Sequence, residues 1–162
     1  MEAANGINLG QFRRWYSQAG TPILTVHQAY NAAAQTLTLT LAQTCPPTPG
    51  QNLKAPLLIP VTVGLINTDG TAALCRLTGQ TESSQDIILQ LTAAQQAFTF
   101  EGLAQQPVVS ILRGFSAPVK VVLEHSLDEL AFLLSHDSDT FNRWEAGQQL
   151  ASQIIFGLVA DL

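Results

Sequence analysis

One serine of the chain stands in a setting that resembles the nucleophile of a hydrolase. In Gly114-Phe115-Ser116-Ala117-Pro118 the serine follows a glycine by two residues, as in the Gly-x-Ser-x-Gly turn that exposes an attacking hydroxyl. Pro118 takes the place of the second glycine, and the stretch precedes a predicted strand instead of following one. We therefore interpret Ser116 as part of a structural turn and expect no nucleophilic role.

A second stretch, Asp137-Ser138-Asp139, begins like a calcium-binding loop. The fifth position of that loop is Phe141, the sixth is Asn142 where glycine is needed, and the twelfth is Gln148 where a bidentate glutamate is needed. Short polar side chains at such a break are typical helix N-caps. The sequence therefore predicts helix capping here and no calcium site.

The other candidates for chemistry are isolated. The sequence has neither the His-Glu-x-x-His pattern of zinc enzymes nor a glycine-rich phosphate loop. His27, His125 and His136 would have to converge in the fold to form a site, and we interpret each as a surface or capping residue. Asp128-Glu129 fits the first turn of a helix, where the helix dipole favours carboxylates. We assign no catalytic, cofactor-binding or metal-binding residue to this chain.

The cysteines and the cationic residues near the start give no stronger signal. Cys45 and Cys75 could in principle pair, but their spacing fits neither a zinc site nor a disulfide framework, so we expect free thiols and a reducing compartment. Arg13, Arg14 and Trp15 could form a contact patch of cations and an aromatic ring. We favour a helix end that is seated against a neighbouring domain.

Composition limits the function further. Only 12% of the 162 residues are charged and 46% are hydrophobic, so we expect part of the surface to be hidden against something else. A net charge of −5 without a basic stripe argues against nucleic acid. No segment is apolar enough to span a membrane, and the first six residues do not resemble a signal peptide.

These residues must be positioned by a mainly β fold. A short helix with Ile7, Leu9, Phe12, Trp15 and Tyr16 on one side is expected to stop before Pro22. Beyond it the hydrophobic period changes to two, and turns separate short strands, which predicts an immunoglobulin-like antiparallel β-sandwich of about seven strands. The strand-like segments are 24–30, 36–41, 57–66, 73–77, 87–91, 97–100, 108–112 and 119–123.

Two α-helices are expected after the sandwich. Ser126 and Glu129 fit a capping box at the start of the first, and the second carries Phe141, Trp144 and Leu150 on one side. We expect no core of their own for these helices, and we expect exposed apolar patches on the helices at both ends of the chain.

Several segments, in the same order over nearly the whole chain, resemble bacterial aminopeptidase N, the alanyl aminopeptidases of the zinc gluzincin family. The segments are 5–22, 45–51, 57–64, 106–108, 113–120 and 141–146. The resemblance implies a fragment in which residues 1–20 are the tail of the catalytic domain, 21–124 a β-sandwich domain and 125–162 the start of a C-terminal helical domain. Many relatives have histidine where Leu58 stands, which puts a polar role there in doubt.

The family also implies a function for the parent protein. Such enzymes are cytoplasmic hydrolases in which zinc, held by two histidines and a glutamate, activates water to remove N-terminal residues from peptides. Those ligands, the general base and the amine-binding glutamate are absent here, so we expect no cofactor and no activity in this chain alone. Its expected role is a structural spacer whose partners are the catalytic and helical domains of the same parent chain, with peptides bound only by the parent.

Two rival functions remain. A free-standing β-sandwich binding module would use loops such as 44–50, and a sugar-binding module would need an exposed aromatic platform on one face. Trp15 and Trp144 are instead predicted in the terminal helical parts. A small hydrolase in its own right is supported only by the incomplete motifs above.

Overall fold

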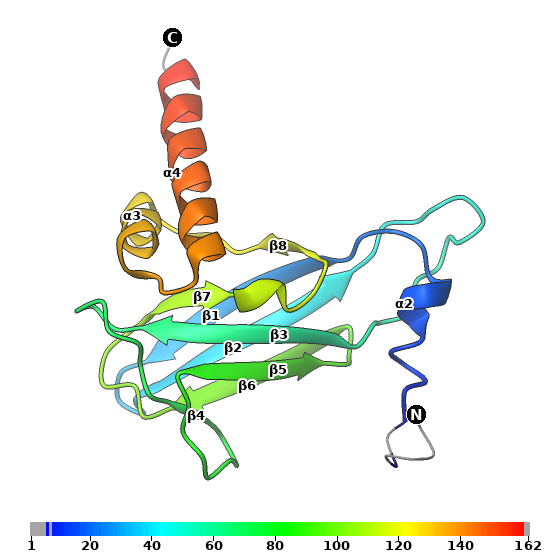
Figure 1. Cartoon of the computed structure of the whole chain (residues 1–162), viewed down its shortest axis with the longest axis horizontal. Helices are drawn as coiled ribbons and strands as arrows, with labels where there is room; N and C mark the ends of the chain where they lie inside the picture. The colour runs from blue at the N-terminus through cyan, green and yellow to red at the C-terminus, as the bar shows by residue number, and fades with distance from the viewer. Residues whose placement is uncertain (1–5, 7, 161–162) are drawn as a thin grey trace.

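A computed structural model describes residues 6 and 8–160 and shows two β-sheets packed face to face (Figure 1). The first sheet has five strands in the order β4-β6-β2-β1-β8, and the second has three in the order β5-β3-β7. The predicted sandwich is therefore confirmed, with eight strands in the described part of the chain. Their bounds are β1 Ile23–Asn31, β2 Thr36–Thr44, β3 Ile59–Ile66, β4 Arg76–Leu77, β5 Asp86–Leu91, β6 Gln95–Glu101, β7 Val108–Ile111 and β8 Lys120–Val122.

The core follows directly from the alternation of threonine and leucine in β2. Leu37, Leu39 and Leu41 are completely buried, whereas the threonines between them are only partly covered. Each buried leucine contributes roughly 1.5–3 kcal/mol relative to an exposed one. Residues of the inner faces of both sheets, including Ile59 and Phe100, complete this cluster. The hydrophobic period of two expected for the strands is therefore confirmed in β2, with its leucines facing inward and its threonines outward.

Pro60 lies in β3, the middle strand of the smaller sheet, without disturbing it. At Pro60 the strand pairs only with β5, because β7 covers β3 only from Val63 onward. On the side that β7 does not reach, the amide of Thr62 donates to Ser116 Oγ at 3.0 Å. The missing N–H of Pro60 falls on this same locally unpaired side, since alternate residues of a strand direct their amides the same way.

One strand pair departs from the predicted antiparallel arrangement. β8 runs parallel to β1, with Lys120 opposite Ile23 and its amide donating to Pro22 O at 2.9 Å. The expectation of a wholly antiparallel sandwich is therefore wrong at this edge. The physical reason is the connection, because the chain leaves β7 in one sheet and crosses to the other before β8 begins.

The N-terminal helix is shorter than predicted. Helix α2 is a single turn, Arg14–Ser17, preceded by turns, and Ile7 lies outside the described residues. The apolar spacing suggested a longer helix, but local polar bonds compete with it. The Asn8 side chain accepts from the amide of Gly10 at 2.8 Å, which favours a turn at that point.

Two α-helices follow the sandwich, as predicted. They are α3, Leu127–His136, and α4, Thr140–Ala160. The capping box of Ser126 and Glu129 is present at the start of α3. Contrary to the expectation that these helices have no core, Leu130, Leu133 and Ala146 form a small buried cluster with Ile66 of β3. That cluster fixes the helix pair to one end of the sandwich.

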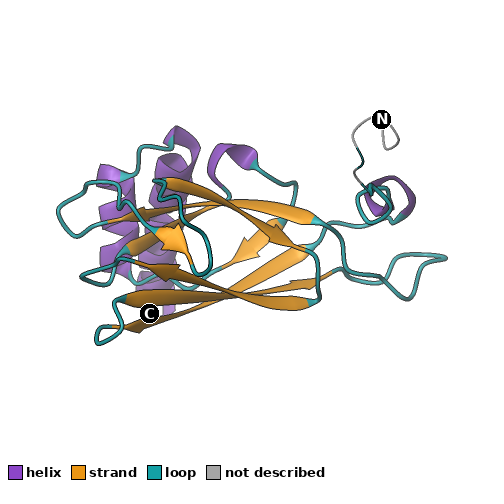
Figure 2. Cartoon of the chain, turned by 90° about the horizontal axis from the view of Figure 1, so that it is seen from below, coloured by secondary structure: helices purple, strands orange, loops and turns teal. Residues whose placement is uncertain are grey.

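The elements that flank the sandwich lie at its opposite ends. Figures 1 and 2 show α2 beyond one end of the strands and the α3–α4 pair standing on the sandwich near the other end. Helix α4 projects away from the sheets (Figure 1), and its residues 151–160 are all exposed.

Candidate functional site

The predicted motifs do not assemble into a catalytic centre. Ser116 Oγ accepts from a strand amide, as a structural turn residue does. His27 is exposed on β1, His125 precedes α3 and His136 ends it. Among residues 6 and 8–160, no group of three histidine, cysteine, aspartate or glutamate side chains is placed to hold a metal ion. The described residues therefore do not fit a zinc or calcium site.

The strongest polar cluster in the described part of the chain lies where the helix pair meets the sandwich, and its centre is Arg113. The Arg113 side chain is 9% exposed, and its guanidinium makes ion pairs with Asp86 at 3.2 Å and Asp137 at 3.6 Å. It also hydrogen bonds to Ser138 Oγ. Arg113 lies across Gly64, where a Cβ would sit 2.0 Å from its Nη1. β3, β5 and the α3–α4 loop thus meet at one side chain.

The capping aspartates extend this cluster. Asp139 Oδ1 accepts from the amides of Phe141 at 3.1 Å and Asn142 at 2.9 Å, so the predicted helix capping is confirmed. Its other oxygen accepts from the amide of Gly114 at 2.8 Å. Burial alone would raise the pKa of Asp139, but these amide bonds and the charge of Arg113 together hold it below the ordinary value.

Further contacts cross the same boundary. The Asn142 amide group donates to Ser110 Oγ and to the carbonyl of Ile111, both at 2.9 Å. The ring of Phe115 lies against Phe141 with centroids 4.0 Å apart, and Phe141 in turn lies 5.7 Å from Trp144. We name this set of contacts around Arg113, Asp139 and Asn142 the helix joint.

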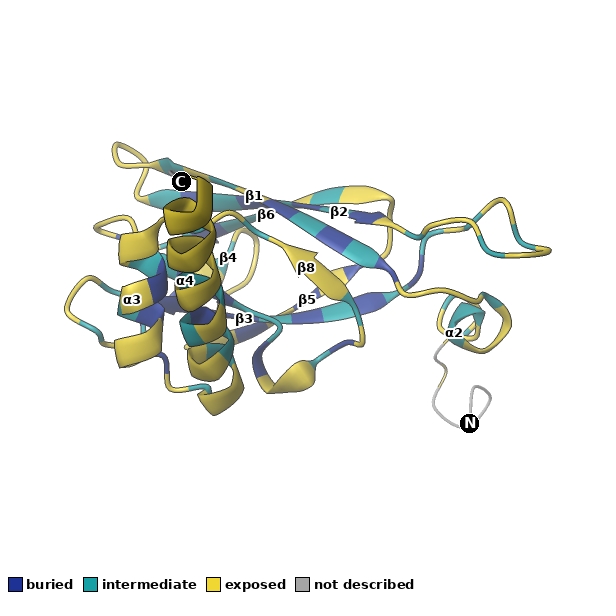
Figure 3. Cartoon of the chain, turned by 90° about the horizontal axis from the view of Figure 1, so that it is seen from above, coloured by how far each residue is buried: buried dark blue, intermediate teal, exposed yellow. Residues whose placement is uncertain are grey.

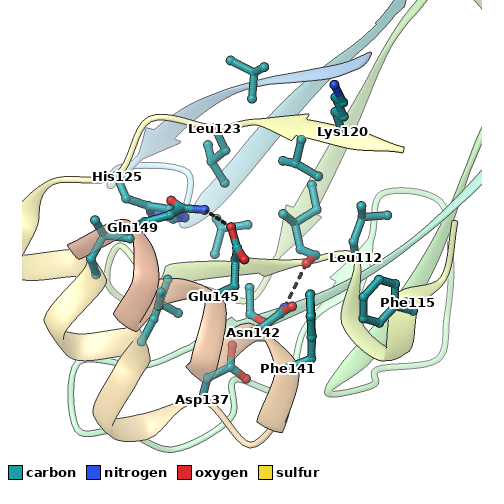
Figure 4. Close-up of a pocket in the computed structure, with 18 of the residues that line it drawn as sticks. Leu112, Phe115, Lys120, Leu123, His125, Asp137, Phe141, Asn142, Glu145 and Gln149 are labelled. Atoms are coloured by element: carbon teal, nitrogen blue, oxygen red, sulfur yellow. Dashed lines mark hydrogen bonds between the residues drawn. The ribbon is translucent and has the colours of Figure 1, made fainter. Parts of the chain in front are cut away.

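A groove runs beside the helix joint, between β7, β8 and the first turns of α4. Its volume is about 580 Å³. Figure 4 shows its polar lining, in which Gln149 donates to Glu145 at 3.0 Å. Asp137 Oδ2 and His125 Nδ1 are buried and have no hydrogen-bond partner among the residues that the structure describes. Burial lowers the pKa of His125, partly offset by the nearby carboxylate of Glu129.

A second joint lies at the opposite end, around Trp15. Its indole Nε1 donates to the carbonyl of Leu58 at 2.9 Å. Gln18 makes two bonds to the backbone of Ala55, one donated and one accepted, and Arg14 donates to the carbonyl of Pro56. These side chains satisfy backbone groups of the extended segment before β3, which has no strand partner of its own. We name these contacts the N-terminal joint.

The structure shows which side of this helix end contacts the sandwich of the same chain. Arg14 and Trp15 bond to it, whereas Tyr16 beside them is 83% exposed and Phe12 is 40% exposed. At Leu58 the polar contact uses the backbone carbonyl, so it does not require a polar side chain at that position.

The expected apolar patches at the two ends are present. Figure 3 shows α4 exposed along its outer half, where five large apolar side chains are uncovered. They are Ile154, Ile155, Phe156, Leu158 and Val159. Trp144 is also exposed, whereas Leu150 packs against the helix cluster, contrary to the prediction for that residue.

Some of this could not be found from the sequence. Arg113 lies in one of the segments that resemble aminopeptidase N, but nothing in its sequence neighbours shows that the guanidinium is buried. A signal existed in Gly64, since a glycine within a strand often marks a close approach. The glycine alone does not identify the group that approaches the strand there.

The fold and the site define a class: an immunoglobulin-like sandwich whose polar clusters fasten its flanking segments, with no metal cluster among the described residues. Residues 20–124 match the family described as "Domain of unknown function (DUF3458) Ig-like fold", so the chain belongs to this family of Ig-like domains. Residues 127–161 match the family described as DUF3458_C, ARM repeats.

The chain is similar to a segment of several bacterial aminopeptidases, which confirms the resemblance drawn from the sequence. It is 41% identical to aminopeptidase N of Escherichia coli over 96% of this chain and 18% of that protein. Identity is 40% to aminopeptidase N of Haemophilus influenzae and 45% to that of Caulobacter vibrioides, each over 94% of this chain and 17% and 16% of the relative. The chain therefore spans less than a fifth of these relatives.

A solved structure gives the same result. The crystal structure of Legionella pneumophila aminopeptidase A in complex with aspartic acid matches 98% of this chain and 17% of its own, with a TM-score of 0.79 and 28% identity. The matched part is the Ig-like and ARM-repeat region of a peptidase. No helix in the described part of the chain has the length and apolarity that a membrane crossing requires.

Proposed function

We propose that this chain is a non-catalytic connecting domain of a cytoplasmic, zinc-dependent aminopeptidase that removes N-terminal residues from peptides. In this role residues 1–20 continue from a catalytic domain, 21–124 form the sandwich and 125–162 open a helical domain. These two domains are its partners, and peptides reach it only through the parent enzyme. In this proposal other parts of the parent enzyme hold the zinc; among the described residues no three potential ligands are grouped to hold a metal ion.

The observation that carries the proposal is the pair of joints at opposite ends of the sandwich. A sandwich that served only as a binding module would need no specific bonds to its flanking segments. At one end, Trp15 hydrogen bonds to the carbonyl of Leu58, just before β3. At the other end, Arg113 is ion-paired with Asp137 of the α3–α4 loop, and Asn142 of α4 hydrogen bonds to the carbonyl of Ile111 in β7. Such bonds between elements distant in sequence fix the direction in which each flank leaves the sandwich.

The test is a chimera of Escherichia coli aminopeptidase N in which this chain replaces the matching segment. We expect the chimera to bind zinc and to hydrolyse an aminoacyl reporter, and the isolated chain to do neither. Loosening a joint in the chimera, by Trp15→Phe or Asn142→Ala, should lower kcat/KM while the zinc content stays constant. A surface change at Gln148→Ala is the matched control and should alter neither quantity.

Two results would overturn the proposal. The first is stoichiometric zinc binding or metal-dependent turnover by the purified chain alone. The second is a folded chimera whose activity is indifferent to both joint substitutions. Binding of an oligosaccharide by the isolated chain at the exposed rings of Phe115 and Trp144 would instead support the rival binding module.

A further inference from the structure

The turn that carries Arg113 has an unusual backbone. Within residues 112–115, Leu112, Gly114 and Phe115 all have positive φ, at 56°, 62° and 54°. For residues other than glycine, the population of this left-handed region is lower by roughly 5- to 30-fold per residue. Strained backbone of this kind persists only where the surroundings hold it in place.

What holds the turn is divided between the sandwich and the helices. Leu112 packs against the main core, and Ser116 bonds to Thr62 in β3. On the other side, Gly114 donates to Asp139, and the Phe115 ring, which is 64% exposed, touches only α4 among the ring contacts of the described residues. The strained φ of Phe115 is therefore not compensated by burial of its own side chain.

We propose that the turn and the helix pair form one coupled element. Leu112, Gly114 and Phe115 keep their left-handed φ only while α3 and α4 are docked, and Arg113, which is ion-paired with Asp137 of the α3–α4 loop, links the turn to the helices. Undocking frees Asp137 and Asp139 from the turn, removes the bonds that hold Gly114, and lets Phe115 relax to negative φ. The helices thus leave as a unit, while the sandwich core stays folded.

The same turn leads directly into β8, so a change in the turn is expected to affect the strand pairing of β8 with β1. The amide of Val119 is held by Ala117 O at 3.0 Å, and Lys120 then begins the pairing with β1. The groove is lined by both β8 and α4, so a released turn changes both walls together. The biological use of this coupling rests on the proposed function, whereas the coupling itself is a property of this chain.

The test is native-state hydrogen exchange on the whole chain. Amides of α3 report docking, and amides of β2, in the core, report global unfolding. We expect α3 to exchange through an opening that leaves β2 protected. Asp139→Asn keeps a cap on α4 but puts an N–H₂ or a weaker acceptor against Gly114, so it should speed exchange in α3 about tenfold and leave β2 unchanged.

A matched pair isolates the strain. Phe115→Ala and Phe115→Gly both delete the ring contact with Phe141, but only glycine tolerates a φ of 54°. We expect α3 to exchange about fivefold more slowly in the glycine variant than in the alanine variant. Equal exchange in the two variants, or parallel changes in α3 and β2, would overturn the proposal. Neither measurement involves peptidase activity. Failure of this proposal would therefore not contradict the connecting role, and failure of the connecting role would not contradict this proposal.

Discussion

At the scale of single residues, the site depends most on Gly64. An added methyl group would lie 2.0 Å from Arg113 Nη1 and 2.9 Å from its Cδ, so a buried charged side chain would have to move. We expect Gly64→Ala to destabilise the protein by about 2–4 kcal/mol, because displacing Arg113 separates it from Asp137, its buried ion-pair partner. The midpoint of urea unfolding measures this change.

A second glycine provides the control. Gly157 lies in the exposed half of α4, and a methyl group added there would meet no neighbouring atom within 4 Å. Gly157→Ala should be neutral or stabilising by up to about 1 kcal/mol, since alanine is the better helix former. Equal losses at both positions would show that the close approach of Arg113 is not the cause.

The two cysteines should differ sharply in reactivity. Cys75 is 2% exposed, and burial raises the pKa of its thiol to about 11. The thiolate is the reactive form, so Cys75 should resist a thiol reagent at pH 8 until the protein unfolds. Cys45 is only partly covered and should react in the folded state. A Cys45→Ser variant should lose the fast phase of labelling, and two fast phases in the native protein would contradict this placement.

At the scale of elements, the attachment of α4 should depend on pH through Asp139. Its folded pKa lies below the ordinary value of 3.8, so the stabilisation is fully present above pH 3.8 and is lost as pH falls through the folded pKa. Asp139→Asn removes this titration. The difference in urea midpoint between wild type and variant should therefore shrink between pH 6 and pH 3, and a constant difference would contradict the pKa direction.

The N-terminal joint should also contribute measurably to stability. Trp15→Phe keeps an aromatic ring against the core but removes the bond to Leu58 O, which leaves a part-buried carbonyl without its donor. We expect a loss of about 1–2 kcal/mol in the free energy of unfolding. Tyr16→Phe, at an exposed ring next to it, should cost almost nothing. If both variants unfold alike, α2 is not fastened to the sandwich.

Much of the fold could be predicted because its elements carry their own periodic patterns. The leucines of β2 and the capping box of α3 are local signals, and both are confirmed. The apolar spacing overestimated the length of α2, because the local bond between Asn8 and Gly10 favours a turn. The placement of α2 on the sandwich could not be predicted, since it depends on side-chain bonds to residues about forty positions away. The same holds for Arg113 and for the parallel direction of β8, since both depend on where the chain lies after it crosses between sheets.

At the scale of the whole molecule, the apolar surface that the low share of charged residues predicts can be located. The main core accounts for the apolar residues of the strands, while those of α4 from Ile154 onward remain exposed. Together with Tyr16 at the opposite end, these are the exposed apolar surfaces of the described chain. Under the proposed connecting role, neighbouring segments of the parent enzyme would cover them, and the sandwich and its two joints would set the separation and direction of those segments.

The central claim is that the chain holds its two ends at a fixed separation, and a distance measurement tests it most directly. Spin labels at Tyr16→Cys and Gln148→Cys, in a Cys45→Ser background with buried Cys75 left in place, report the distance from the N-terminal joint to the base of α4. We predict one narrow distance distribution, which broadens when Asn142→Ala loosens the helix joint. A broad or two-peaked distribution in the otherwise unchanged chain would contradict the account.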